Sequence, residues 1–263
     1  MFTIDKYVVA ESLDQAYELN QNRRNVIIGG MLWLKMGRKK IGTAIDLSNL
    51  NLNTIEEYDD SFKIGAMCTL RDVENHLGLN SYFNNLLSKS VEHIVGVQMR
   101  NLATIGGSIY SRFGFSDILT ALLSLDSYVE LHKGGIVPLK KFVDMPYDND
   151  ILVNIIIKKD GRSSCYKSHR ISSSDFPVLA CAVSNKGNEW YASVGARPGK
   201  AVLKQLTLSE KPSNEEIDKA AQDITRLMTF GTNMRGNTRY RRLLADVLIK
   251  RNMEEIIGGN HAD

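Results

Sequence analysis

The chain has 263 residues, of which 43% are hydrophobic and 24% charged, ordinary proportions for a globular protein. Its 33 Lys and Arg residues nearly balance its 30 Asp and Glu residues, so the net charge gives no argument for nucleic-acid or membrane-surface binding, and we expect no nucleic-acid partner. The sequence contains no run of about 18 apolar residues, so it predicts no transmembrane helix. The N-terminus lacks the basic-then-apolar order of a secretory signal.

The first 54 residues alternate strands and helices. We expect strands at 7–10, 25–28 and 43–47. Ser12 can cap a helix after the first strand, and a second helix follows Gly29-Gly30. This order predicts a small α/β unit. Neither G-x-G-x-x-G nor G-x-x-x-x-G-K-S/T occurs, so a nucleotide would need another kind of loop.

Residues 55–160 continue the mixed pattern. Strands are expected at 62–66, 128–132, 136–139 and 151–157. Helices are expected after Thr69, over 82–91 and from Asp117, where apolar residues recur at helical spacing. A charged interruption at 158–162 is the expected domain boundary. The predicted domains are therefore 1–160, with subdomains of about 1–54 and 55–160, and 161–263.

The last hundred residues have a different pattern. Strands at 164–170, 178–185 and 189–196 follow each other closely, which predicts an antiparallel meander. Ser213 can cap a helix with acidic residues in its first turn, and a final helix runs from about 238 to 250. We expect a small α+β C-terminal domain with a three-stranded antiparallel sheet.

Residues 97–126 contain the strongest indication of a ligand site. In the run 104–108, Thr-Ile-Gly-Gly-Ser, two glycines allow a ligand to approach the backbone. Two hydroxyls and the peptide N–H groups can donate to an anion, although a tight turn before a buried helix would also contain Gly-Gly. Asp117 is either a residue of the helix start or, if it faces outward, an acceptor for ribose or adenine. Together with Gly29-Gly30, this run could hold a pyrophosphate from two sides.

The other reactive side chains indicate no catalytic or metal centre. Cys68, Cys165 and Cys181 lie far apart without any C-x-x-C, which argues against structural zinc or a cysteine-held iron–sulfur cluster. An odd cysteine count without a signal peptide is typical of reduced thiols, so we expect a cytoplasmic protein. The five histidines have no partners at catalytic spacing, and we assign no catalytic residue and no metal ligand.

The motifs occur in an order that resembles the FAD-binding (medium) subunit of the molybdenum hydroxylases, the family of xanthine dehydrogenase and aerobic carbon monoxide dehydrogenase. The matching segments span nearly the whole chain: 26–30, 45–47, 64–69, 100–107, 115–117, 123–126, 166–176 and 235–242. Their joint order and spacing carry the resemblance. One departure is Met31-Leu32-Trp33, where the family usually has a small or polar residue after the first Gly-Gly.

The resemblance implies an α+β, two-subdomain FAD-binding fold of the PCMH or vanillyl-alcohol-oxidase type, followed by the C-terminal domain. FAD would lie across the two subdomains, with its pyrophosphate between the two Gly-Gly loops. Asp117 would bind the adenosine end, and Lys167 would stabilise negative charge on the reduced flavin. Trp33 could pack on the flavin, but a core role is expected. The full set of implied cofactor-binding residues is Val26, Ile27, Ile28, Gly29, Gly30, Met31, Leu32, Trp33, Ile94, Thr104, Ile105, Gly106, Gly107, Ser108, Asp117, Leu152 and Lys167.

The resemblance also implies a function that needs no acid–base side chains. In this family a molybdopterin-binding large subunit oxidises the organic substrate, and electrons pass through 2Fe–2S clusters of a small subunit to FAD. FAD then gives them to NAD⁺ or another acceptor. We therefore expect a xanthine dehydrogenase-like, FAD-carrying electron-transfer subunit of a heterotrimer. Two alternatives remain open: a stand-alone flavoprotein oxidoreductase, and a degenerate scaffold subunit without FAD.

Overall fold

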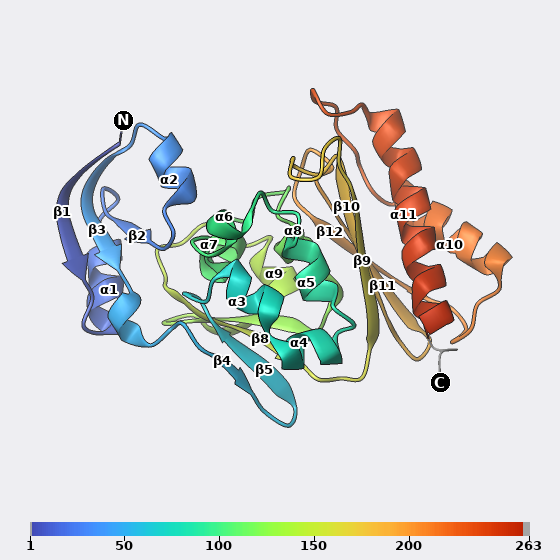
Figure 1. The fold of residues 1–263 in the computed structure, drawn as a ribbon, viewed down its shortest axis with the longest axis horizontal. Coiled ribbons are helices and arrows are strands. Elements are labelled where there is room, and N and C mark those ends of the chain that lie inside the picture. The colour runs from blue at the N-terminus through green and yellow to red at the C-terminus, as the bar shows by residue number, and fades with distance from the viewer. Residues whose placement is uncertain (1, 260–263) are drawn as a thin grey trace. The chain divides into compact units, whose positions relative to one another are not determined.

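The computed structural model describes residues 2–259 (Figure 1). The chain forms two compact units. Unit 1 contains the chain up to Val73, Val97–Ser111 and Ser127–Ile157. Unit 2 contains Glu74–Gly96, Arg112–Asp126 and the chain from Lys158 onward. Within the described residues, no helix combines the length and the apolar character needed to cross a membrane.

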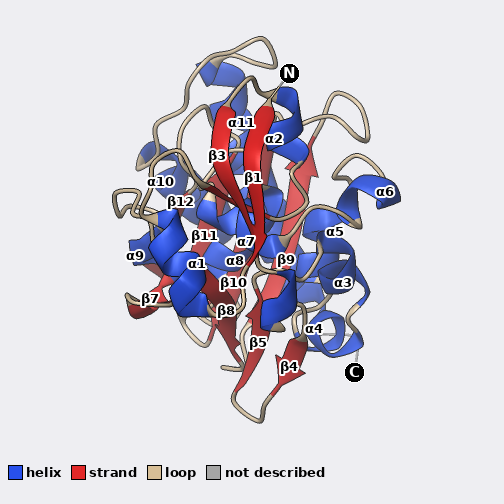
Figure 2. Cartoon of the chain, turned by 90° about the vertical axis from the view of Figure 1, so that its left-hand side faces the viewer, coloured by secondary structure: helices blue, strands red, loops and turns tan. Residues whose placement is uncertain are grey.

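Unit 1 begins with the expected alternation of strands and helices. Its first elements are β1 (Thr3–Val9), α1 (Leu13–Asn20), β2 (Val26–Ile28), α2 (Leu32–Met36) and β3 (Lys40–Asp46). The three strands pair in parallel in the order β1-β3-β2, and α2 stands beside them (Figure 2). Ser12 caps α1 by accepting a hydrogen bond from the Gln15 amide, as predicted.

A five-stranded sheet forms the second part of unit 1, in the order β4-β5-β8-β6-β7. Its strands are β4 (Ile55–Glu57), β5 (Ser61–Gly65), β6 (Ser127–Leu131), β7 (Gly135–Pro138) and β8 (Leu152–Lys158). Short helical segments accompany them: η1 (Ser48–Leu50), α3 (Leu70–Asn75), α6 (Val97–Arg100), α7 (Ile105–Tyr110) and α9 (Leu139–Phe142). Strand β4 was not predicted, because its three residues include only one apolar side chain and its pairing with β5 is a tertiary feature.

Unit 2 is built on an antiparallel sheet of four strands in the order β12-β11-β10-β9. These are β9 (Ser163–His169), β10 (Leu179–Lys186), β11 (Glu189–Gly195) and β12 (Val202–Thr207). The prediction of a three-stranded sheet is therefore wrong. Strand β12 was missed because it is an edge strand in which Lys204 and Gln205 interrupt the apolar residues.

Helices pack against both faces of the unit 2 sheet. Helices α10 (Asn214–Arg226) and α11 (Thr238–Gly259) enclose a core with alternate sheet residues such as Cys181 and Val183. Helix α8 (Asp117–Ser124) lies on the opposite face, where the Ser184 hydroxyl donates to the Ser124 carbonyl. Helix α5 (Leu86–Val91) contacts β9 and α8.

Helix ends follow local chemistry, with two corrections. The predicted cap of α10 is present as a capping box between Ser213 and Glu216. The helix expected over 82–91 begins only at Leu86, as α5: Tyr82 is the last residue of another helix, α4 (Leu77–Tyr82), and Asn84 and Asn85 adopt left-handed conformations between the two. Helix α11 continues beyond the predicted end at 250, because residues such as Met253 extend its buried face.

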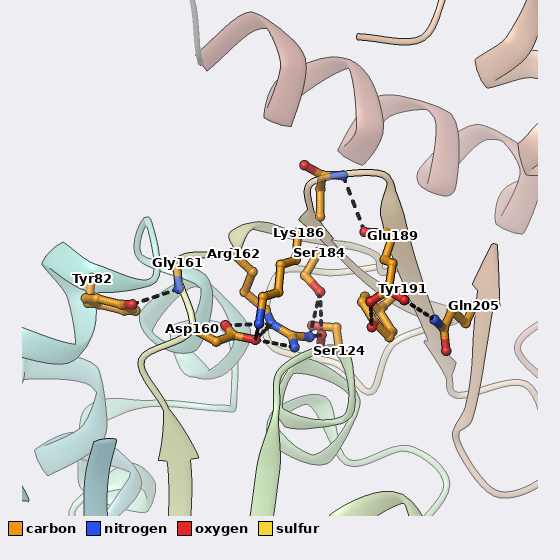
Figure 3. Close-up of polar contacts among 11 residues, drawn as sticks. Tyr82, Ser124, Asp160, Gly161, Arg162, Ser184, Lys186, Glu189, Tyr191 and Gln205 are labelled. Atoms are coloured by element: carbon orange, nitrogen blue, oxygen red, sulfur yellow. Dashed lines mark hydrogen bonds and ion pairs between the residues drawn. The ribbon is translucent and has the colours of Figure 1, made fainter. Parts of the chain in front are cut away.

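A buried ion pair holds the connection from β8 to β9 (Figure 3). The Arg162 guanidinium donates to both carboxylate oxygens of Asp160 at 2.6–3.0 Å and to the Ser124 carbonyl at 2.8 Å. It also lies 4.8 Å from the ring centre of Tyr191. The side chains of Arg162 and Asp160 are 6% and 10% exposed, so this contact joins the connection to α8 and β11 inside unit 2.

Candidate functional site

The two glycine-rich loops, about 75 residues apart in the sequence, meet in unit 1. A Cβ atom placed on Gly29 would lie 2.8 Å from Oγ1 of Thr104. One placed on Gly30 would lie 1.8 Å from the carbonyl oxygen of Leu102. Real Cβ atoms essentially never approach other atoms this closely, so side chains at 29 and 30 would push the loops apart. The end of β2 therefore lies directly against the start of α7.

The first loop, Gly29–Leu32, presents backbone donors. Met31 adopts a left-handed conformation (φ 55°, ψ 15°) just before α2. Its side chain packs, with that of Leu34, against the small core beside the parallel sheet. In the described part of the chain, the amides of residues 29–32 have no hydrogen-bond acceptor. The bulky residues that depart from the family pattern thus leave these amides available.

Trp33 is not a core residue, and the expectation that it would be one is wrong. Helix α2 has only five residues, and Leu34 occupies its buried side. Trp33 consequently faces outward and is 44% exposed.

The second loop uses its amides within the protein. The Ile105 and Gly106 amides donate to the carbonyls of Cys68 and Ala66 at 2.8 and 2.9 Å. The Gly107 amide donates to Oγ1 of Thr104 at 3.2 Å. These bonds fix the start of α7 to the residues after β5. Free backbone donors in the described residues are therefore found in the first loop rather than the second.

The hydroxyls of the second loop lie at the start of α7. Thr104 is the N-cap of this helix, and its Oγ1 is the atom nearest to a Cβ on Gly29. The Ser108 hydroxyl donates to the Thr104 carbonyl at 2.9 Å. A Cβ on Gly106 would lie 2.5 Å from the Ala66 carbonyl oxygen, so this glycine permits α7 to pack closely on its neighbour.

Asp117 lies in the first turn of α8, in unit 2, where Ser116 rather than Asp117 is the N-cap. Asp117 is only 4% exposed. Its Oδ1 accepts from the Tyr166 hydroxyl at 2.5 Å, and its Oδ2 lies 2.9 Å from the Arg170 guanidinium. Burial raises the pKa of Asp117, against the opposing effects of the Arg170 charge and the Tyr166 hydrogen bond. Any bond to an adenosine group would have to share these oxygens.

Lys167 is on the other face of the same sheet. Successive strand residues point to opposite faces, so Lys167 faces away from the side that Tyr166 shares with Asp117. Its ammonium group pairs with the carboxylate of Glu255 on α11. The structure therefore does not bring Lys167 and Asp117 together.

The remaining predicted residues are divided between the units. Ile94 follows α5 in unit 2 and is half-buried, whereas Leu152 begins β8 and is 6% exposed. In unit 1, residues 26–28 form β2 and lead directly into the first loop. The structure thus places Gly29 and Gly30 directly against residues 102–104. Asp117, which is bonded to Tyr166, and Lys167, which pairs with Glu255, lie on opposite faces of the unit 2 sheet.

Tyr166 and Arg170 were missed as partners of Asp117. The two-residue period of a strand places residues 166, 168 and 170 on one face, and this signal was available in the sequence. Contact with Asp117 requires α8 to pack on that face, which the spacing of residues does not reveal.

The sequence matches a known protein family, and the fold is similar to that of solved structures. Residues 2–159 match the family described as the FAD binding domain in molybdopterin dehydrogenase. The chain is 24% identical over 274 residues to the glyceraldehyde dehydrogenase medium chain of Sulfolobus acidocaldarius, covering 95% of this chain and 97% of that one. Its fold is similar to that of a chain of quinoline 2-oxidoreductase from Pseudomonas putida 86, with a TM-score of 0.86, 17% identity and 98% of both chains covered. It is also similar to a chain of carbon monoxide dehydrogenase from Hydrogenophaga pseudoflava, with a TM-score of 0.84, 20% identity and 96% of both chains covered.

Proposed function

The chain belongs to the family of FAD-binding domains of molybdopterin dehydrogenases, and we propose that it is the FAD-carrying electron-transfer subunit of a molybdenum hydroxylase complex. It receives electrons from 2Fe–2S clusters of a small partner subunit and passes them to NAD⁺ or another acceptor. A molybdopterin-binding large subunit oxidises the organic substrate. The name of the Sulfolobus relative, a medium chain of a dehydrogenase, supports a subunit role.

The observation that carries the proposal is the contact between the two Gly-Gly loops. Gly29 lies beside the Thr104 hydroxyl, next to amides that have no acceptor among the described residues. Backbone amides and hydroxyls are donors for phosphate oxygens. This donor set fits a pyrophosphate, and we assign that of FAD to the contact. We propose that the rest of the cofactor contacts four further residues, Asp117, Ile94, Leu152 and Lys167.

The residues of this chain bind and orient the cofactor. Bound FAD supplies redox chemistry that no side chain of the protein provides. The first loop offers neutral amide donors whose positions are fixed by the close packing of Gly30 on Leu102. An anion can therefore be held there without burial of a charged side chain, which would carry a desolvation cost.

The flavin content of the purified chain tests the proposal. We expect the visible absorption bands of oxidised flavin, and FAD on heat release. Gly30→Ala places a Cβ 1.8 Å from the Leu102 carbonyl oxygen, so we expect FAD affinity to fall at least about tenfold, equivalent to roughly 1.4 kcal/mol. Gly37→Ala is the matched control, because a Cβ there would be 3.4 Å from its nearest neighbour.

A colourless chain that also fails to take up added FAD would overturn the electron-transfer role. Equal FAD affinity in the Gly30→Ala and Gly37→Ala proteins would overturn the assignment of the pyrophosphate to the two loops.

A further inference from the structure

One segment beside the first loop is strongly basic. Residues 19–45 contain six basic residues and no acidic one, whereas charges over the whole chain nearly balance. All six are exposed: Arg23, Arg24, Lys35, Arg38, Lys39 and Lys40. Within residues 2–259 only Arg24 has an ion-pair partner, Asp5, at 2.8 Å. Five exposed cations of this segment are thus not neutralised by the described part of the chain.

Two large apolar side chains are exposed among these cations. Trp33 is 44% and Met36 is 72% exposed. They are three residues apart on α2, so they lie on one face of that helix. The other face packs against the parallel sheet through Leu34, and Figure 2 shows α2 beside β1 and β3. Tryptophan, methionine and arginine are enriched in protein–protein interfaces, and Trp and Arg dominate their binding energy.

We propose that this α2 surface, formed by Trp33 and Met36 with Arg23, Lys35, Arg38, Lys39 and Lys40, is the docking site for an acidic face of another subunit of the complex. The proposal rests on the proposed function, which supplies such subunits. Acidic side chains around an apolar pocket would compensate the cations and bury the exposed face of α2.

Charge decides the kind of partner. A second copy of this chain docked through the same surface would place like charges opposite each other, which is repulsive. Outside residues 19–45, acidic residues slightly outnumber basic ones, so the rest of the chain carries no net positive charge to hold an extended polyanion. Helix α2 has five residues, which is too short to lie along a membrane as an amphipathic helix. None of these three objections applies to a local acidic patch on a partner protein.

The test uses the complex isolated from its own host through a tag on this chain. Molybdenum and iron per chain report the partner subunits, and absorption reports FAD, at increasing NaCl concentration. We expect Lys35→Glu/Arg38→Glu to weaken association about tenfold and to release the metal-bearing subunits at lower salt. Met36→Ala should weaken association at every salt concentration, because apolar contacts are not screened.

Lys140→Glu/Lys141→Glu on α9 is the matched control. Both lysines are exposed, and they have no ion-pair partner among the described residues. This variant makes the same change in charge and should retain the metals as the unmodified chain does.

Release of molybdenum and iron at lower salt with FAD retained supports the proposal. Equal metal retention by the α2 and α9 variants would overturn it. Loss of FAD with the metals retained would also overturn it, because the cations would then serve the cofactor. Charge-dependent binding to duplex DNA or phosphatidylserine vesicles, with metal retention unchanged, would overturn the proposal and show that the α2 surface binds that ligand and not a partner subunit. Absence of FAD from the unmodified chain would instead count against the proposed function.

Discussion

Glu255 on α11 is held between two lysine side chains of unit 2. It pairs with Lys167 and lies 3.3 Å from the ammonium group of Lys89. Burial acts to raise its pKa, but hydrogen bonds from Lys167 and Cys165 and the charges of both lysines prevail and lower the pKa of Glu255 to about 2. The carboxylate therefore stays ionised down to strongly acidic pH in the folded protein.

This pairing makes stability depend on pH. The unfolded carboxyl titrates near its ordinary pKa of 4.5, so the stabilisation is complete above that pH and is lost as pH falls towards about 2. Because the Glu255 side chain is 43% exposed, solvent screening limits the effect. We expect Glu255→Gln to lower the free energy of unfolding by about 1 kcal/mol at neutral pH and to change it little at the acidic end. Urea unfolding across this range measures the difference, and a pH-independent difference would contradict the expectation.

The buried Arg162 connects several elements of unit 2 (Figure 3). Arg162→Met would remove the 2.6 Å partner of the Asp160 side chain, which is 10% exposed in the folded protein, and leave only the longer contact of 3.5 Å with Lys186 among the described residues. Leaving a buried charge without its partner costs about 3–5 kcal/mol, and we expect a loss of this size in the free energy of unfolding. Chemical denaturation measures it.

The matched control is Arg226→Met, which removes an exposed pair with Asp223 at 3.2 Å. Exposed pairs contribute about 0–1 kcal/mol. Comparable losses for the two arginine variants would show that burial does not determine the strength of the Arg162 contact.

Elements with strong local signals were predictable from the sequence. The caps at Ser12 and Ser213 and the meander from β9 to β11 each depend on residues close together in the chain. Strand β12 and the break at Asn84 and Asn85 were not found. An edge strand with mixed polarity has no clear period, and asparagine only permits the left-handed conformation that tertiary packing selects.

At the scale of the molecule, neither unit is one continuous stretch of chain. Helices α5 and α8 precede residue 126 but pack in unit 2 against strands that follow residue 160. A chain cut at the predicted boundary near 160 would lack the sheet that covers these two helices. The domain boundary expected near residue 160 stays a prediction, because the two units are defined by the compactness of the fold and not as separate domains.

The candidate site was predictable only in part, because some of its features depend on local sequence and others on tertiary contacts. The residues of each Gly-Gly loop could be named from local sequence, because a glycine pair between apolar runs is a local signal. The direct contact of Gly30 with Leu102 could not be derived from either loop alone, since it depends on how β2 and α7 are brought together. The ion pair of Asp117 with Arg170 is hidden from the sequence in the same way.

Binding of FAD should stabilise the whole chain, because a ligand that binds only the folded state lowers its free energy. At 100 times its dissociation constant, FAD would add about 2.7 kcal/mol, which corresponds to a rise of roughly 5–10 °C in Tm for a protein of this size. Thermal unfolding with and without added FAD measures this shift. The Gly37→Ala protein should show the same rise and the Gly30→Ala protein a smaller one; identical rises in both would contradict a role for the loop contact.

The two tryptophans of the chain are divided between the two units. Trp33 of unit 1 is 44% exposed, whereas Trp190 of unit 2 is 1% exposed, and its indole N–H donates to the Ser209 carbonyl at 3.4 Å. Their fluorescence should therefore differ, with long-wavelength emission open to iodide quenching from Trp33 and shielded short-wavelength emission from Trp190. Following both components during denaturation would separate the unfolding of each unit in one unlabelled sample.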